Sequence, residues 1–236
     1  MLKAIIFDFG LTLVHSKRWI EIEVETIVKE SLNILKQIGV INLKKEEFVL
    51  ARNFYIGLRN KSRETGKEIT AFNVVNSVLN HLGKKVEKDI IDNTIEKVYR
   101  QCFPAIKLGN GVKETLDRLT EKGYILGIIS NAHYSPCIFW VLDKFDIRKY
   151  FNEIIVSADV GERKPFPKIF NIALNRLNIK AEEAAFVGDY YPYDIVGAKN
   201  IGMQTFWITS KDKSEKGEHA DFLISEIGEI LNYIDN

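Results

Sequence analysis

Short runs of apolar residues along the chain each end abruptly at a polar or acidic residue. The runs cover residues 4–7, 125–129, 154–156, 184–187 and 204–208, with a sixth at 222–224. Runs of this length that are apolar throughout, rather than alternating, are typical of strands buried on both faces of a parallel sheet. The pattern therefore predicts a parallel β-sheet at the core of the protein.

Segments with helical periodicity separate these runs. In residues 112–122, Val112, Leu116 and Leu119 fall on one stripe, and the segment ends at Gly123. Residues 168–177 show a similar stripe. Strands that alternate with such helices indicate an α/β fold, a doubly wound, Rossmann-like parallel sheet with helices on both faces.

Residues 14–105 have a different pattern, with helical periodicity and almost no run that resembles a strand. Helices are expected at residues 18–37, 45–59, 71–82 and 88–102, with breaks at Gly39, Gly66 and Gly83. We therefore expect an all-helical domain at 14–105, inserted after the first strand. The α/β core domain is then discontinuous and comprises residues 1–13 and 106–236.

Composition excludes several classes of function. The 236 residues include 33 Lys+Arg and 32 Asp+Glu, a net charge of +1, which leaves no basic excess for nucleic acid or a membrane surface. The start lacks the apolar stretch of a signal peptide, and no apolar run reaches the roughly 18 residues of a spanning helix. Cys102 and Cys137 are too few for a disulfide framework and lie outside any zinc-binding pattern. We expect a cytoplasmic protein without nucleic-acid or membrane partners.

Polar residues stand where the predicted strands end. Asp8, Ser130 and Asp189 each follow such a run, and the carboxyl ends of parallel strands meet at the edge where ligands bind. A single Asp after a strand is more often a turn or capping residue. The presence of Lys164 and Asp194 in loops at the same edge favours a site instead.

Taken in order, these residues resemble the motifs of the haloacid dehalogenase-like hydrolases, and the resemblance covers the whole chain. The matching positions are Asp8-Phe9-Gly10-Leu11-Thr12 for the first motif, Ser130 for the second, Lys164-Pro165 for the third, and Gly188-Asp189 with Asp194 for the fourth. Each match alone is weak, but four in order at strand ends are specific. The resemblance implies that the helical insert is a cap domain, which would set substrate specificity.

The resemblance also implies a phosphatase that hydrolyses a small phosphomonoester with Mg²⁺. In that family the metal would be held by the carboxylates of Asp8 and Asp189 and by the backbone carbonyl of Gly10, with Asp194 supplementing the shell. Oxygen ligands of this kind suit Mg²⁺. Asp8 would be the nucleophile that forms an aspartyl-phosphate.

Three further residues would act on the phosphoryl group by the same resemblance. Lys164 would neutralise charge on the phosphoryl group and on Asp8, as a catalytic and a substrate-binding residue. The Ser130 hydroxyl and the Asn131 amide would donate hydrogen bonds to the phosphoryl oxygens.

Gly10 departs from the family pattern, in which a second Asp serves as general acid and base. Such catalysis typically contributes about 10²–10⁴-fold in rate, and glycine cannot provide it. The alternative is a catalytically weak relative that binds phosphate or a phosphorylated metabolite and acts through a partner. A phosphomutase and a metal-independent 2-haloacid dehalogenase are less favoured, the latter because Gly188-Asp189 is intact.

Three further features, a histidine, a basic stretch and a group of tyrosines, each allow two interpretations. His15 could reach a leaving group but is better interpreted as a surface histidine. A basic stretch could bind the distal end of an anionic substrate, although a solvated helix face is the favoured interpretation; it comprises Arg52, Arg59, Lys61, Arg63 and Lys67. Tyrosines around the fourth motif could narrow the site or pack against the sheet, and they are Tyr190, Tyr191 and Tyr193. No role is assigned to His133 or Cys137.

Overall fold

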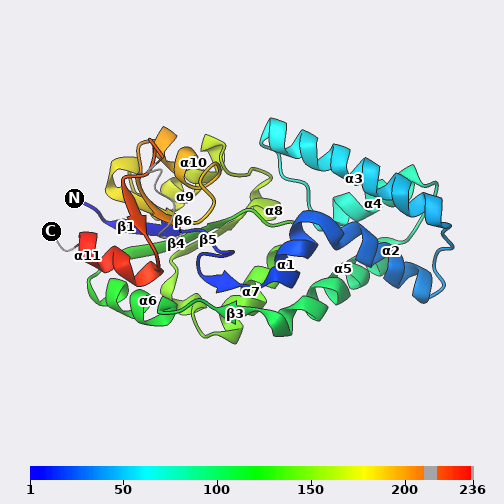
Figure 1. Ribbon diagram of the computed structural model, residues 1–236, viewed down its shortest axis with the longest axis horizontal. Coiled ribbons are helices and arrows are strands. Elements are labelled where there is room, and N and C mark those ends of the chain that lie inside the picture. The colour runs from blue at the N-terminus through cyan, green and yellow to red at the C-terminus, as the bar shows by residue number, and fades with distance from the viewer. Residues whose placement is uncertain (210–216, 235–236) are drawn as a thin grey trace.

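The computed structural model describes residues 1–209 and 217–234, and a parallel sheet forms its centre (Figure 1). Six strands pair in the order β5-β4-β1-β6-β7-β8, and every pair is parallel. Their bounds are β1 (Ala4–Phe7), β4 (Ile125–Ser130), β5 (Glu153–Val156), β6 (Ala184–Gly188), β7 (Gln204–Ile208) and β8 (Phe222–Ile224). The strands and the fold class predicted from the apolar runs are confirmed.

Helices cover both faces of this sheet. In Figure 1 the helices α6 (Val112–Glu121) and α7 (Ser135–Lys144) lie below it, and α9 (Pro167–Leu177) and α10 (Ile195–Asn200) lie above it. Short helices and turns complete the core: α8 (Ser157–Val160), α11 (Leu231–Ile234), and 3₁₀ turns at Arg148–Tyr150, Ala181–Glu183 and Ile227–Ile230; a further 3₁₀ turn at Phe103–Ala105 lies where the helical segment ends.

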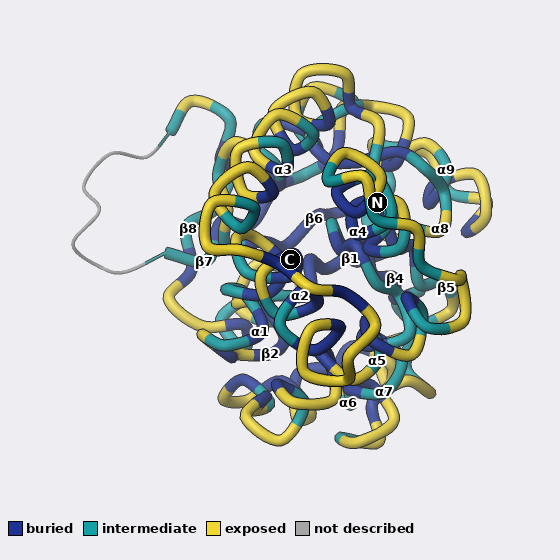
Figure 2. Tube along the Cα trace, turned by 90° about the vertical axis from the view of Figure 1, so that its right-hand side faces the viewer, coloured by how far each residue is buried: buried dark blue, intermediate teal, exposed yellow. Residues whose placement is uncertain are grey.

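The central strands are buried on both faces, as the apolar runs predict. Ile5 and Phe7 belong to one hydrophobic cluster, whereas Ala4 and Ile6 belong to another. Successive residues of a strand point to opposite faces, so β1 contributes to two separate cores. Figure 2 shows β1, β4 and β6 as a buried interior surrounded by exposed turns of helix.

The segment between β1 and the rest of the core is mostly helical and lies to one side of the sheet (Figure 1). It contains α1 (Lys17–Glu21), a π-helical turn (Ile22–Thr26), α2 (Ile27–Gln37), α3 (Lys45–Thr65), α4 (Ala71–His81) and α5 (Lys88–Cys102). The helix expected at 18–37 is therefore interrupted by a π-helical turn. No helix in the described ranges has the length and apolar character needed to cross a membrane.

Helix α3 is longer than its apolar period predicts. It continues beyond residue 59 and ends at Gly66, which adopts the left-handed conformation with φ 73°. The inward residues of its last two turns are Arg59 and Ser62, both buried. Because these inward positions are polar, the hydrophobic pattern stops before the helix does.

A small antiparallel ribbon forms where the chain leaves and re-enters the core. It pairs β2 (Val14–His15) with β3 (Lys107–Leu108). Strands of two residues are too short to produce a recognisable alternation, so sequence analysis does not predict them.

Candidate active site

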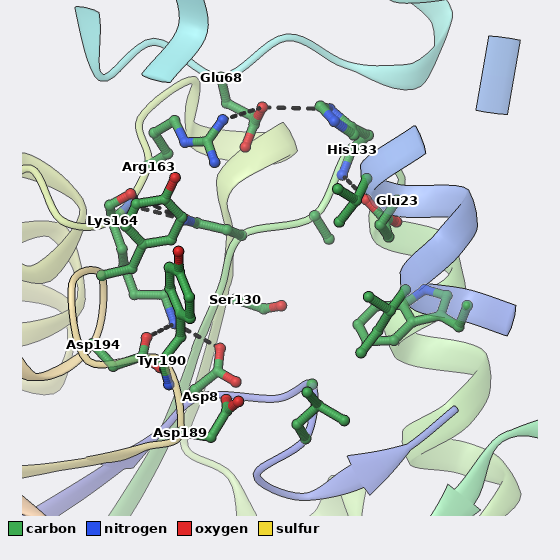
Figure 3. A pocket seen from close by; sticks show the side chains of 18 of the residues that line it. Asp8, Glu23, Glu68, Ser130, His133, Arg163, Lys164, Asp189, Tyr190 and Asp194 are labelled. Atoms are coloured by element: carbon green, nitrogen blue, oxygen red, sulfur yellow. Dashed lines mark hydrogen bonds and ion pairs between the residues drawn. The ribbon is translucent and has the colours of Figure 1, made fainter. Parts of the chain in front are cut away.

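Asp8, Lys164 and Asp194 form a buried ion-paired group at the carboxyl ends of the strands (Figure 3). The Lys164 ammonium donates to Asp8 Oδ1 at 2.6 Å and lies 2.7 Å from Asp194 Oδ1. The side chains of Lys164 and Asp194 are only 1% and 2% exposed, whereas that of Asp8 is 12% exposed. Asp8 is thus the carboxylate of this group with the greatest access to the pocket.

The backbone fixes both carboxylates in place. The Asp8 amide donates to the Val187 carbonyl at 2.8 Å, which extends the pairing of β1 with β6 by one residue. Asp194 precedes α10, and its Oδ2 accepts from the Tyr190 amide at 3.0 Å. Leu11, with φ 61°, makes the tight turn that follows Asp8.

Asp8, Asp189 and Asp194 bring one carboxylate oxygen each to within 4.8 Å of one another. Burial, together with the charges of the other two carboxylates, raises the pKa of Asp189 to about 8. Burial likewise raises the pKa of Asp194 to about 6, despite the nearby Lys164. Three carboxylates this close repel one another, so the cluster has the oxygen donors and the charge that suit a divalent cation.

Lys164 remains charged because it lies between two carboxylates. Burial alone would lower its pKa, but Asp194 and Asp8 outweigh that effect and raise it. The Asn131 side chain holds the Lys164 backbone: Oδ1 accepts from the Lys164 amide at 2.9 Å, and Nδ2 donates to its carbonyl at 3.0 Å. Asn131 therefore positions the lysine and keeps one Nδ2 hydrogen for a ligand.

The expected site residues line a single pocket with a volume of about 360 Å³. Those that line it are Asp8, Gly10, Ser130, Asn131, Lys164, Asp189 and Asp194. Around the fourth motif, Tyr190 and Tyr193 also line the pocket, whereas Tyr191 packs against Trp207 with 4.8 Å between ring centroids. His15 is exposed on β2 and is not among the described residues that line the pocket.

Trp19 of α1 occupies the space next to Gly10. A Cβ added at Gly10 would lie 2.7 Å from Trp19 Cζ3. The indole is 4% exposed and packs edge-on against Phe9, with 5.6 Å between ring centroids. Any side chain at position 10 therefore requires the indole to move.

This contact predicts that Gly10→Asp destabilises the protein by about 1–3 kcal/mol through overpacking. Trp19→Leu, which makes room, should recover part of that loss when the two substitutions are combined. Chemical denaturation of the wild type, both single variants and the double variant measures the coupling free energy between the two positions. Additive effects in this cycle would contradict the predicted clash.

The far side of the pocket contains polar residues to which sequence analysis assigns no function. Glu23, Glu68, His133 and Arg163 line it together with Arg59 and Arg63. Arg59 is only 9% exposed, so the solvated-face interpretation of the basic stretch is wrong for this residue. The sequence signals for Arg59 are the basic stretch in which it lies, one interpretation of which is a contact with the distal end of a substrate, and the polar end of α3.

Curated relatives of this chain include several phosphatases. A glyceraldehyde 3-phosphate phosphatase from Pyrococcus furiosus is 37% identical over 130 residues, about half of each protein (53% of each chain). A protein of the same name from Methanocaldococcus jannaschii is 28% identical and aligns over 100% of this chain and 98% of its own length. A phosphoglycolate phosphatase from Vibrio parahaemolyticus is 29% identical over 52% of this chain and 54% of its own length.

Solved structures share the fold along almost the whole chain. A HAD phosphatase from Thermococcus onnurineus superposes with a TM-score of 0.68 at 23% identity and covers 98% of this chain and 97% of its own. A 2-haloacid dehalogenase from Pseudomonas syringae pv. Tomato superposes with a TM-score of 0.70 at 21% identity, with the same coverage.

A family model described as haloacid dehalogenase-like hydrolase matches residues 5–208. The match extends from β1 to β7 and includes every strand-end residue of the pocket. The chain belongs to the haloacid dehalogenase-like hydrolase family.

Proposed function

We propose that this chain is a magnesium-dependent phosphatase that hydrolyses a small phosphomonoester through Asp8. The observation that carries the proposal is the buried group at the strand ends, in which Lys164 contacts both Asp8 and Asp194. Relatives that align over nearly their full length are named glyceraldehyde 3-phosphate phosphatases, which makes that ester the first substrate to test.

Each residue of the site has its own role in hydrolysis of the phosphate ester. The Asp8 carboxylate attacks phosphorus and the ester P–O bond breaks, which leaves an aspartyl-phosphate and an alkoxide that takes a proton from solvent, since Gly10 supplies none; water then attacks this phosphorus, gives up its proton to solvent, and releases phosphate and free Asp8. Lys164 neutralises negative charge near the nucleophile, and Ser130 and the remaining Nδ2 hydrogen of Asn131 donate to the phosphoryl oxygens.

Asp8, Asp189 and Asp194, with the Gly10 carbonyl, would hold the metal. A bound Mg²⁺ would supply neutralisation of the phosphoryl charge and orientation of the ester. We further propose that residues 14–105 act as a cap domain that covers the strand ends, because Trp19, Glu23 and Arg59 from this segment line the pocket.

A second candidate is a catalytically weak relative that binds a phosphorylated metabolite and acts through a partner. The contact between Gly10 and Trp19 favours it, because the indole fills the space that an acidic side chain at position 10 would need. This candidate requires binding of the phosphate ester with little turnover.

Phosphate release from glyceraldehyde 3-phosphate, with Mg²⁺ and after chelation by EDTA, separates the two candidates. We expect multiple turnovers with Mg²⁺ and a loss of at least about 10²-fold after chelation, restored when Mg²⁺ is added back. Less than one turnover per protein, together with calorimetric binding of the same ester, would support the weak relative instead. Turnover that is unaffected by EDTA would rule out the proposed metal dependence.

A further inference from the structure

The pocket has two chemically different ends (Figure 3). Asp8, Asp189 and Asp194 lie at one end, whereas Glu23 and His133 lie across the pocket from them. The first end is the proposed phosphate and metal site. The second end is therefore placed to contact the part of the substrate that carries no phosphate.

Glu23 lies on the π-helical turn, a type of irregularity that is frequent at functional sites. Its side chain is held at one oxygen, because Oε2 accepts from the His133 amide at 2.9 Å. Its Oε1 makes no well-formed hydrogen bond, although the residue is only 7% exposed; the buried Tyr99 hydroxyl, which makes none either, is close enough to lower the pKa of Glu23. A buried acceptor of this kind is costly unless a ligand or water satisfies it.

Arg59 is held in a similar way by a neutral histidine. His133 Nδ1 lies 2.6 Å from the Ile69 carbonyl, so Nδ1 donates, and Nε2 accepts from Arg59 Nη1. Burial and the neighbouring Arg59 lower the pKa of His133 to about 4, which is consistent with this neutral form. Arg59 Nε, like Nε1 of Trp19, has no partner.

The buried charges at this end are balanced when Glu23 is ionised. Two buried guanidinium groups, those of Arg59 and Arg163, accompany the buried carboxyl groups of Glu23 and Glu68. Arg163 lies 3.7 Å from Glu68 and donates to Ser62 Oγ at 2.9 Å. Arg63 lines the pocket but is exposed. With Glu23 ionised, a further buried negative charge would have no buried cation left to pair with, which disfavours an anionic ligand here.

Unpaired donors beside an unpaired acceptor match a hydroxyl or a hydrated carbonyl, which can both accept and donate. A carboxylate can only accept, and it would face Glu23. We propose that Glu23 and Arg59 form a subsite for the uncharged, hydroxyl- or carbonyl-bearing end of the substrate, and that Glu23 discriminates against esters that carry a carboxylate there. This inference rests on the proposed phosphatase function and names the substrate class.

The ionisation of Glu23 provides a test. Burial raises its pKa to about 7, so the fraction that is negatively charged increases between pH 6 and pH 8. Discrimination against a carboxylate should increase over the same range. The titratable groups that influence Glu23 or respond to it are Arg59 and Tyr55 of α3, Glu68 after it, Tyr99 and Cys102 of α5, and Cys137 of α7.

The experiment compares glyceraldehyde 3-phosphate with 3-phosphoglycerate, which differ only in an aldehyde and a carboxylate. The quantity measured is kcat/KM for glyceraldehyde 3-phosphate divided by kcat/KM for 3-phosphoglycerate. In this ratio the ionisation of the phosphate that both esters carry cancels. In the wild type we expect this ratio to rise about 10-fold from pH 6 to pH 8. In Glu23→Gln the ratio should fall to its low-pH value and lose its pH dependence. Glu25→Gln, an exposed substitution in the same turn, should behave as the wild type.

Other outcomes separate this inference from the function on which it rests. A ratio that is independent of pH in the wild type, or an equal loss of both activities in Glu23→Gln, would show a purely structural role for Glu23. The pH series of the wild type tests whether ionisation of Glu23 controls the discrimination, even if the Glu23→Gln variant does not fold. If the wild type and Asp8→Asn are equally inactive on both esters with Mg²⁺, the phosphatase proposal itself fails.

Discussion

Asp8→Asn is expected to lower phosphate release by at least about 10⁴-fold, the order of loss seen when a nucleophile is removed. The amide is nearly the same size as the carboxylate but cannot form an acyl phosphate. Lys164 keeps its contact with Asp194, so the fold should survive the substitution. The measurement is kcat/KM for glyceraldehyde 3-phosphate at saturating Mg²⁺.

The stability of this variant separates a chemical loss from a structural one. Asp8 is one of the three clustered carboxylates, so its neutralisation relieves repulsion in the metal-free protein. We therefore expect a Tm that is unchanged or higher than that of the wild type without metal. Asp89→Asn, an exposed substitution of the same kind on α5, should leave activity intact. Activity within about 100-fold of the wild type in Asp8→Asn would mean that another group attacks phosphorus.

The sheet is predictable because its strands satisfy a simple rule. A strand that is buried on both faces must be apolar at every position. The runs that precede Asp8 and Asp189 are apolar over four or five consecutive residues. Parallel pairing then places the ends of these strands together. The meeting of Asp8 and Asp189 thus follows from topology once the strands are known, and the short loop before α10 adds Asp194 to them.

Helices without an apolar stripe are harder to predict. Residues 138–142 of α7 are apolar without interruption, so their pattern has no helical period. The end of α3 is missed for the opposite reason, since Arg59 and Ser62 face inward. In both segments tertiary contacts, rather than a local period, determine which side of the helix is buried.

Sequence patterns do not predict which residues meet at the far end of the pocket. Arg59 and His133 are 74 residues apart, and His133 and Glu23 are 110 apart. Glu23 and His133 have no distinguishing pattern in their own segments, and Arg59 is one of several basic residues in its helix. Only the packing of the helical segment against the core brings the three together. Asn131 shows a similar limit: its position at a strand end suggests a ligand contact, yet its side chain holds the Lys164 backbone.

Lys164→Met is expected to cost about 3–5 kcal/mol of unfolding free energy in the absence of metal, and to lower kcat/KM by at least about 10²-fold. Methionine has a similar length, but it leaves Asp8 and Asp194 buried together without their cation. Guanidinium denaturation with EDTA measures the loss of stability. Mg²⁺ should restore part of it, because a divalent cation bound to the same carboxylates compensates for the missing ammonium.

Lys168→Met is the matched control for this loss. Lys168 is also ion-paired, to Glu162 at 2.6 Å, but its side chain is 65% exposed, so its removal should cost less than about 1 kcal/mol.

The cost of Lys164→Met should also depend on pH. With their ammonium partner removed, the buried carboxylates destabilise the fold only when they are ionised, and Asp194 and Asp189 have pKa values of about 6 and about 8 even in the wild type. The loss should therefore be small near pH 5, where protonation removes the repulsion, and should grow as the pH rises through this range. An equal loss at pH 5 and pH 9 would mean that Lys164 stabilises the protein by packing rather than by charge.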